Sequence, residues 1–311
     1  MRIVRHLSAG VVSFSREGNL SSQLRHLTTN VTSAGGVSFI REGNLSSPIV
    51  LVAIHGGPGS HRDFRHIASE FNSKKGGIAF EFVRCDLSGY GDSEPLPLSL
   101  APTAINYAHA LFEALDAAKI LQPNRSVVFM GHSLGGHIAM ELASLSTAPV
   151  AGIALIAPAC MRPHRMIGNE SLYWLNVWMG NNSLHPLFGP AISSLLDYVY
   201  KHVAGFSKNT RLEEIIVTQR RVALLDFKRF SAQAKSLQCP VFYAYAENDK
   251  LIQKTRFEEL ASVLQPLGGR RLVYTSGGHN IQKTKCTELA NEISDWISHH
   301  CIRYMRIHDR M

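Results

Sequence analysis

Residues 127–145, VVFMGHSLGGHIAMELASL, decide how the rest of the sequence is interpreted. An apolar, β-branched run is followed by apolar residues at helical spacing, which predicts a strand leading into a helix. Ser133 lies at the junction, between Gly131 and Gly135. A serine in such a sharp G-x-S-x-G turn projects its oxygen clear of the sheet, while the glycines let neighbouring backbone pass. Serine and glycine are common in turns, so the meaning of this motif depends on what accompanies it.

Length and composition limit the class of protein. The 311 residues, 45% of them hydrophobic, suffice for one large α/β domain with an insertion. The longest apolar run, residues 150–159, is too short for a membrane span of roughly 20 residues and suits a buried strand. The net charge of +8 would suit a nucleic acid, but no nucleic-acid motif accompanies it. We therefore expect no membrane span and no nucleic acid, and the sequence leaves the oligomeric state unknown.

The cysteines and the first residues bear on the compartment. Five scattered cysteines without a C-x-x-C pair suggest neither a disulfide framework nor a zinc site, so a reducing compartment such as the cytoplasm fits. Residues 1–34 are basic and rich in serine and threonine, which would also suit mitochondrial targeting. Residues 9–22 recur as residues 34–47, identical at 12 of 14 places. Two short copies cannot build a repeat architecture, and we expect residues 1–34 to be a mobile extension.

Polar residues follow several of the predicted strands. The loop HGGPG, residues 55–59, ends one strand, and its glycines could present backbone N–H groups to an anion. Asp249 follows the strand at 240–246, and His279 follows the strand at 271–275. Strands alternate with helices, which indicates a mostly parallel sheet with helices on both faces. Because parallel strands end at one edge, Ser133, Asp249 and His279 should converge there.

Other polar residues near these turns have a simpler interpretation. Asp86 and Asp92, in the turn DLSGYGDSEP, are expected to cap backbone N–H groups. We assign His55 to hydrogen bonding within its loop, and the spacing of His132 and His137 does not suit a metal site. We expect neither a metal nor an organic cofactor.

Residues 161–235 interrupt the strand pattern with aromatic-rich helical stretches, which predicts an inserted helical cap. The core would then comprise residues 35–160 and 236–311. Ten Lys and Arg residues of the cap face five acids, which weakly favours an acidic substrate group, although a solvated helix face explains the charge equally well. Most of its apolar side chains should pack the helices. Trp174, Trp178 and Phe188 are the candidates for contact with a substrate.

These motifs together resemble the α/β-hydrolase fold superfamily, with GHSLGG as nucleophile elbow, HGGPG as oxyanion loop, AENDKLI as acid turn and GGHN as histidine turn. The pairing of HGGPG with DLSGYGDS is most similar to the branch of proline iminopeptidases, C–C bond hydrolases and epoxide hydrolases. At a finer level the sequence resembles a nematode group of α/β-hydrolases. The resemblance covers residues 35–160 and 236–300.

The resemblance implies a role for each motif residue. Ser133 would be the nucleophile, His279 its general base and Asp249 the carboxylate that orients the imidazole. The backbone N–H groups of Leu134 and Gly57 would hold the oxyanion. The family has aspartate at the Ser133 position in epoxide hydrolases, and tryptophan at the Leu134 position in proline iminopeptidases, so both activities are disfavoured.

The function expected from this resemblance is that of a serine hydrolase acting on a small to medium ester, thioester or lipid-like acyl substrate. A C–C bond hydrolase or an amidase or peptidase of the same fold is the alternative. A non-catalytic binding protein that keeps the fold is a third hypothesis, from a different class. Fold alone is a poor guide among them.

Overall fold

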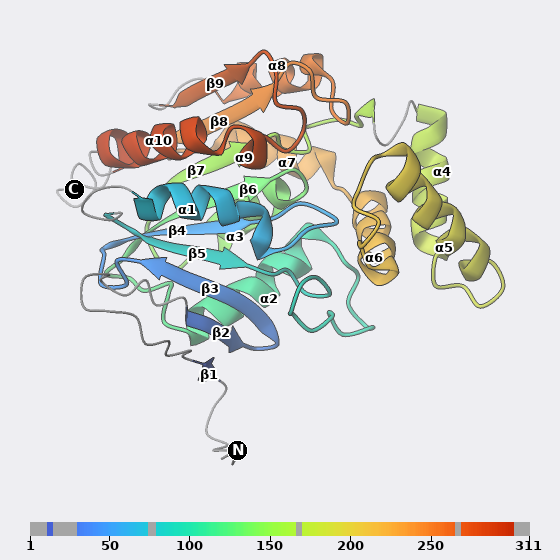
Figure 1. Ribbon diagram of the computed structural model, residues 1–311, viewed down its shortest axis with the longest axis horizontal. Coiled ribbons are helices and arrows are strands. Elements are labelled where there is room, and N and C mark those ends of the chain that lie inside the picture. Colours follow the sequence, from blue (N-terminus) through green and yellow to red (C-terminus); the bar gives the residue numbers. More distant parts are fainter. Residues whose placement is uncertain (1–10, 15–29, 74–78, 166–169, 265–268, 302–311) are drawn as a thin grey trace.

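The computed structural model describes residues 11–14, 30–73, 79–165, 170–264 and 269–301 (Figure 1). Within these residues one nine-stranded sheet has the order β1-β2-β3-β5-β4-β6-β7-β8-β9. Strands β1 to β3 and the β3–β5 pair are antiparallel, and the other pairs are parallel. The strands are β1 (Val11–Phe14), β2 (Asn30–Ala34), β3 (Val37–Gly43), β4 (Ile49–Ile54), β5 (Glu81–Cys85), β6 (Ser126–His132), β7 (Val150–Ile156), β8 (Val241–Ala246) and β9 (Arg270–Tyr274). The predicted α/β architecture is confirmed.

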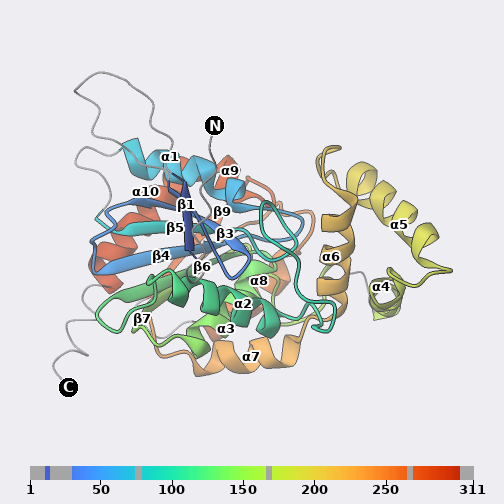
Figure 2. The same ribbon diagram turned by 90° about the horizontal axis from the view of Figure 1, so that it is seen from below.

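Helices cover both faces of the sheet (Figure 2). On one face lie α1 (Arg65–Ser73), α9 (Ile281–Thr284) and α10 (Cys286–Trp296), which pack on β4, β5 and β8 through residues such as Phe71 and Trp296. On the other face lie α2 (Ala104–Ala117), α3 (Gly135–Leu145), α7 (Phe227–Ser236) and α8 (Lys254–Val263). With both faces covered, β4 and β8 are buried along their whole lengths, which explains their continuous apolar sequences.

Between β7 and β8 the chain leaves the sheet. Helices α4 (Glu170–Asn182), α5 (Gly189–Tyr198) and α6 (Leu212–Ala223), with the π-helical turn Val199–Val203, form a separate layer at the side of the molecule, which we call the cap (Figure 1). The predicted cap ran to residue 235, but α7 belongs to the core. Its Phe230 and Ala234 are buried in one cluster with β7 and β8.

The N-terminal region departs from the expectation of a mobile extension. Strand β2 pairs with β3 across a turn at Gly35 and Gly36, and β1, from the first copy of the repeat, pairs with β2. Val37–Gly43, the strand of the second copy, therefore lies inside the sheet, between β2 and β5. An uncovered β3 would expose unpaired backbone groups, which β2 satisfies. The rest of residues 1–29 lies outside the described residues.

Glu81 connects the antiparallel part of the sheet to the parallel part. Its carboxylate is fully buried and accepts from Arg41 on β3, at 2.5 Å, and from Arg125 just before β6, at 2.6 Å. Arg125 is itself buried and also donates to the carbonyl of Ser47 at 3.0 Å. One carboxylate thus neutralises two guanidinium groups that would be costly to bury alone.

We predict that Glu81→Gln lowers the free energy of unfolding by about 3 kcal/mol, because it leaves Arg125 buried without a counter-charge. The matched control is Glu247→Gln, which removes the exposed pair with Lys254 and should cost less than about 1 kcal/mol. Urea denaturation followed by circular dichroism measures both. If both variants lost the same free energy of unfolding, the buried ion pairs of Glu81 would contribute no more to stability than an exposed pair.

Candidate active site

The turn between β6 and α3 holds Ser133 in a left-handed conformation, with φ of 53°. Its N–H donates to the carbonyl of Ile156 at 3.1 Å, and its own carbonyl accepts from Gly136 and Ala159 at 3.0 Å each. A side chain at Gly131 would collide with the backbone of Gly135 and Gly136. The glycines therefore allow the helix to begin directly against the strand it follows, as the sequence motif predicts.

Asp249 and His279 come together as expected from their positions after β8 and β9. His279 Nδ1 lies 2.7 Å from Asp249 Oδ2, while Asp249 Oδ1 accepts from the N–H groups of Leu251 and Ile252 at 2.8 and 3.0 Å. Burial disfavours the charged carboxylate, but the hydrogen bond and charge of His279, with the two backbone donors, outweigh it and lower the pKa of Asp249. The acid is thus an ionised, fixed partner for the imidazole.

Ser133 and His279 line the same cavity, which has a volume of about 190 Å³. No hydrogen bond joins the two side chains within the described residues, a contact that often tightens only when substrate binds. Core and cap both contribute to the wall. The lining residues are Gly56, Gly57, Pro58, Asp63, His132, Ser133, Leu134, His164, Gly205, Phe206, Ser207, Val222, Leu251, His279, Asn280 and Lys283.

The two residues expected to hold an oxyanion, Gly57 and Leu134, also line this cavity. Leu134 precedes the first residue of α3, and within the described chain its N–H donates to no other group. The glycine loop passes directly over Ser133, since a Cβ at Gly56 would lie 2.9 Å from that of Ser133. A Cβ at Gly57 would lie 2.9 Å from the Thr218 hydroxyl. The loop is therefore held between the elbow and helix α6 of the cap.

Arg221, on α6, places a buried positive charge behind this loop. Its guanidinium carbon lies 4.9 Å from the ring centre of Tyr107 and 5.3 Å from that of Tyr90, and its Nη1 would lie 3.3 Å from a Cβ at Gly57. Among the described residues no carboxylate pairs with it, and Nη1 has no hydrogen-bond partner. The aromatic faces compensate part of the charge.

His132 and Gln282 fix the backbone of His279. His132 Nε2 donates to the carbonyl of His279 at 3.1 Å, and Gln282 Nε2 donates to His132 Nδ1 at 3.3 Å. Burial, reinforced by the nearby His279, holds the pKa of His132 well below its usual range, so this ring is neutral. Its two nitrogens are occupied by hydrogen bonds, which agrees with the expectation that it is not a metal ligand.

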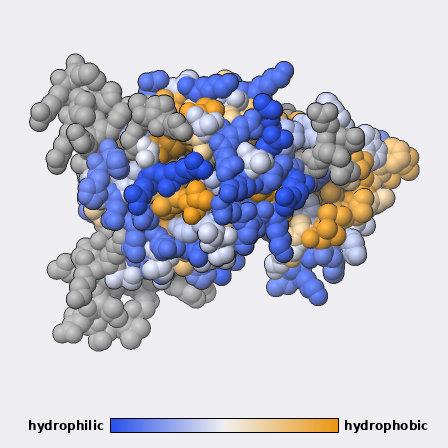
Figure 3. All heavy atoms as spheres, turned by 90° about the horizontal axis from the view of Figure 1, so that it is seen from above, coloured by the Kyte–Doolittle hydropathy of each residue, from blue (hydrophilic) through white to orange (hydrophobic). Residues whose placement is uncertain are grey.

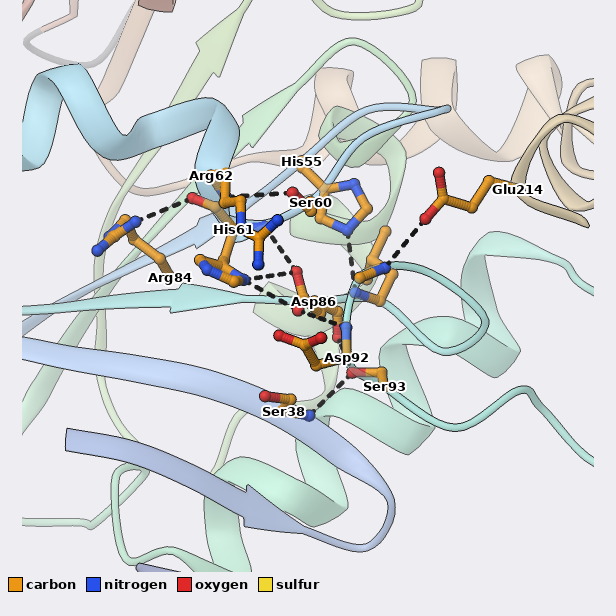
Figure 4. A network of polar contacts seen from close by, with 12 residues as sticks. Ser38, His55, Ser60, His61, Arg62, Arg84, Asp86, Asp92, Ser93 and Glu214 are labelled. Atoms are coloured by element: carbon orange, nitrogen blue, oxygen red, sulfur yellow. Dashed lines mark hydrogen bonds and ion pairs between the residues drawn. The ribbon is translucent and has the colours of Figure 1, made fainter. Parts of the chain in front are cut away.

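The turn after β5 supports the glycine loop from below (Figure 4). Asp86 accepts from the backbone and ring of His61, at 2.6 and 2.9 Å, and from the N–H of Asp92 at 2.9 Å. His55 accepts from the N–H of Leu87 at 3.0 Å and contacts the carbonyl of Gly56. The expected capping role of Asp86 is confirmed, as is loop hydrogen bonding by His55, whereas Asp92 is exposed and contributes only its backbone.

The structure does not bring Trp174, Trp178 or Phe188 to this cavity. Their side chains are 67%, 48% and 46% exposed. Helix α4 meets α6 through small and polar residues, with Gly180 against Ala223. The two tryptophans therefore lie on the other side of α4. With neighbouring apolar residues they form the exposed apolar surface of the cap (Figure 3).

Comparison with known proteins places the chain in a family. The model of the alpha/beta hydrolase family matches residues 49–291, which include the glycine loop, the elbow, the acid turn and the histidine turn. The chain belongs to the alpha/beta hydrolase family. A protein of unassigned function from Caenorhabditis elegans is 26% identical to this chain over 231 residues. The chain spans 59% of the length of that relative, and the match covers 68% of the chain.

Solved structures agree with the family fold. A lipase-esterase related protein from Clostridium acetobutylicum superposes with a TM-score of 0.62 at 17% identity, covering 84% of this hydrolase-family chain and 100% of its own. An esterase from Exiguobacterium antarcticum gives 0.62 at 14% identity, with 84% and 96% covered. A thermophilic esterase from Thermogutta terrifontis gives 0.62 at 16% identity, with 84% and 93% covered. At these identities the likeness establishes the fold.

Within the described residues of this family member, no helix is both long and apolar enough to span a membrane.

Three residues at the site were not identified from the sequence. Arg221 and His164 lie in the stretch interpreted only as a helical cap, and Gln282 lies just beyond the histidine turn. No sequence motif marks them, since only tertiary packing brings them close to the turns that carry Ser133, Asp249 and His279. The excess of Lys and Arg over acidic residues in the cap was the one sequence feature that pointed to a functional positive charge such as that of Arg221.

We predict that Asp86→Asn lowers the free energy of unfolding by about 2 kcal/mol at pH 7, because a charged acceptor of three hydrogen bonds is lost. Hydrogen bonds from His61 and Asp92 overcome the cost of burial and lower the folded-state pKa of Asp86 below its ordinary 3.8. Its contribution is therefore present above pH 3.8 and lost as the pH falls through the lowered value. Urea denaturation at several pH values checks this.

The matched control is Asp92→Asn, from the same turn, which should change stability by less than about 0.5 kcal/mol. A difference between wild type and Asp86→Asn that stays constant from pH 7 to pH 3 would contradict the assigned role of the carboxylate.

Proposed function

We propose that the protein is a serine hydrolase that cleaves a small ester or thioester through an acyl-enzyme. The observation that carries this proposal is the joint placement of Ser133 and His279 on one cavity, with Asp249 hydrogen-bonded behind the imidazole at 2.7 Å. A nucleophile, a base and an orienting acid in this relation perform acyl transfer on several unrelated folds.

In the first step the Ser133 oxygen attacks the substrate carbonyl carbon while His279 Nε2 takes the hydroxyl proton. The buried, ionised Asp249 stabilises the imidazolium that forms and keeps Nδ1 protonated. Collapse of the tetrahedral intermediate breaks the bond to the alcohol or thiol, and His279 returns the proton to that leaving group. Water then attacks the acyl-enzyme with the same base, which releases the acid and restores the serine.

The oxyanion would be held by the N–H groups of Leu134 and Gly57. Leu134 precedes α3, so the partial positive charge of that helix end adds to its donor. Arg221 lies beyond the glycine loop and does not line the cavity, so it acts through its field rather than by contact.

The cavity supports a small substrate rather than a long lipid-like chain. Its volume is about 190 Å³, and Phe206 and Val222 of the cap limit it on one side. An ion pair between Asp63 and Lys283, at 2.6 Å, forms part of its wall. Such a wall would be costly to cover with an unbranched alkyl chain, which offers no hydrogen bonds.

We predict that a fluorophosphonate probe labels the wild-type protein and fails on Ser133→Ala, because the reagent reports an activated serine. Ser207→Ala is the matched control, since Ser207 lines the same cavity from the cap. It should retain labelling. Asp249→Asn should label at least about 10³-fold more slowly, since the imidazole loses its orienting carboxylate.

Gel fluorescence measures labelling, and turnover of short acyl esters, thioesters and amides shows which bond is cleaved. Equal labelling of the wild type and Ser133→Ala, or a folded wild type that neither labels nor turns over any of these substrates, would refute the proposal in favour of a binding protein.

A further inference from the structure

His164 is a buried imidazole whose hydrogen-bonding capacity is unused. The residue is 4% exposed and lies between β7 and the cap, where it lines the same cavity as Ser133 and His279. Within the described residues neither of its ring nitrogens has a hydrogen-bond partner. Two buried polar atoms without partners cost free energy that an apolar side chain would not.

The other buried histidines of the site show how unusual this is. His55 and His132 use both ring nitrogens. His137 contacts the carbonyl of Ala159 at 2.7 Å and stacks on Phe230 at 4.0 Å between ring centres. His164 alone among these four has no such contact, although it is as deeply buried. Packing alone therefore does not account for an imidazole at this position.

The ring of His164 is neutral. Burial, together with the neighbouring His279, lowers its pKa to about 3, while the backbone of Leu251 opposes the shift without reaching hydrogen-bond geometry. A neutral imidazole offers one N–H donor and one nitrogen acceptor. Whichever ring nitrogen meets the ligand, a hydroxyl group can pair with it in either tautomer, by accepting from the N–H or by donating to the bare nitrogen, whereas a carboxylate can only accept from the N–H.

We propose that His164 binds a hydroxyl group of the substrate, so that the preferred substrate is a small hydroxylated ester or thioester. This inference rests on the proposed hydrolase activity of the same cavity. The hydroxyl could belong to the acyl part or to the leaving alcohol, because both must lie near Ser133 and His279 when the carbonyl is attacked. A substrate with a methyl group in that place would leave His164 buried and unpaired.

Two isosteric pairs of esters test the two positions. For the acyl part, ethyl 3-hydroxybutyrate is compared with ethyl 3-methylbutyrate. For the alcohol, 2-hydroxyethyl butyrate is compared with propyl butyrate. In each pair a hydroxyl replaces a methyl group, and hydrolysis is followed by proton release. We expect the wild type to favour the hydroxylated member of at least one pair by about tenfold or more in kcat/KM, since a site built to bind a hydroxyl rejects the analogue without it.

His164→Leu should abolish that preference by slowing the hydroxylated ester and sparing or accelerating the methyl analogue. His164→Asn keeps a donor and an acceptor and should retain part of the preference. The melting temperature separates this role from a structural one. His164→Leu should melt no lower than wild type, whereas His137→Leu, the matched buried histidine, should melt lower because the Ala159 carbonyl loses its partner.

Fluorophosphonate labelling of each variant separates the two proposals, because an unlabelled wild type means that the hydrolase assignment itself has failed. The role of His164 is overturned if labelled wild type hydrolyses the methyl member of both pairs at least as fast. It is also overturned if His164→Leu keeps the wild-type preference, or slows all four esters equally with a lower melting temperature.

Discussion

The left-handed backbone of Ser133 is the constraint on which the site depends. Most residues avoid that conformation, and here three backbone hydrogen bonds, to Ile156, Gly136 and Ala159, hold it in place. These bonds join β6, the end of β7 and the first turn of α3. The serine is therefore positioned by the parallel sheet itself and not by its own loop. Leu134, which follows directly, also lines the cavity, so the proposed nucleophile and the proposed oxyanion donor are positioned by one piece of backbone.

Two further groups of hydrogen bonds hold the residues around Ser133 in place. The acid turn holds Asp249 through backbone N–H groups and leaves its second oxygen for His279, whose carbonyl is bound in turn by His132. The glycine loop rests on the turn around Asp86 through His55. His279, Asp249 and the glycine loop are thus each held by hydrogen bonds from neighbouring groups. These bonds make the proposed site rigid.

The sequence alone predicted which core residues would meet, but it did not predict which cap residues would line the cavity, and the difference has a physical reason. Ser133, Asp249 and His279 each follow a strand, and parallel strands bring their ends together whatever the details of packing. In the cap, Trp174 and Trp178 have apolar neighbours on every side in sequence, so helical spacing could not say which face is covered. The contact of Gly180 with Ala223 decides it, and it depends on how two helices approach in space. The N-terminal strands escaped notice because β1 and β2 are separated by a long stretch of sequence, which hides their pairing.

Arg221, which has no carboxylate partner among the described residues, suggests that the cap does more than shape the pocket. A cap that only shaped the pocket could be exchanged between relatives as an independent module, with new substrates following from new walls. Here α6 touches the glycine loop through Thr218 and places a guanidinium behind it, between Tyr90 and Tyr107 of the core. Under the proposed function, substrate selectivity and electrostatic stabilisation of the transition state would both depend on α6. A different cap would have to supply an equivalent positive charge behind the glycine loop. Without it, the electrostatics of the core site would change together with the choice of substrate.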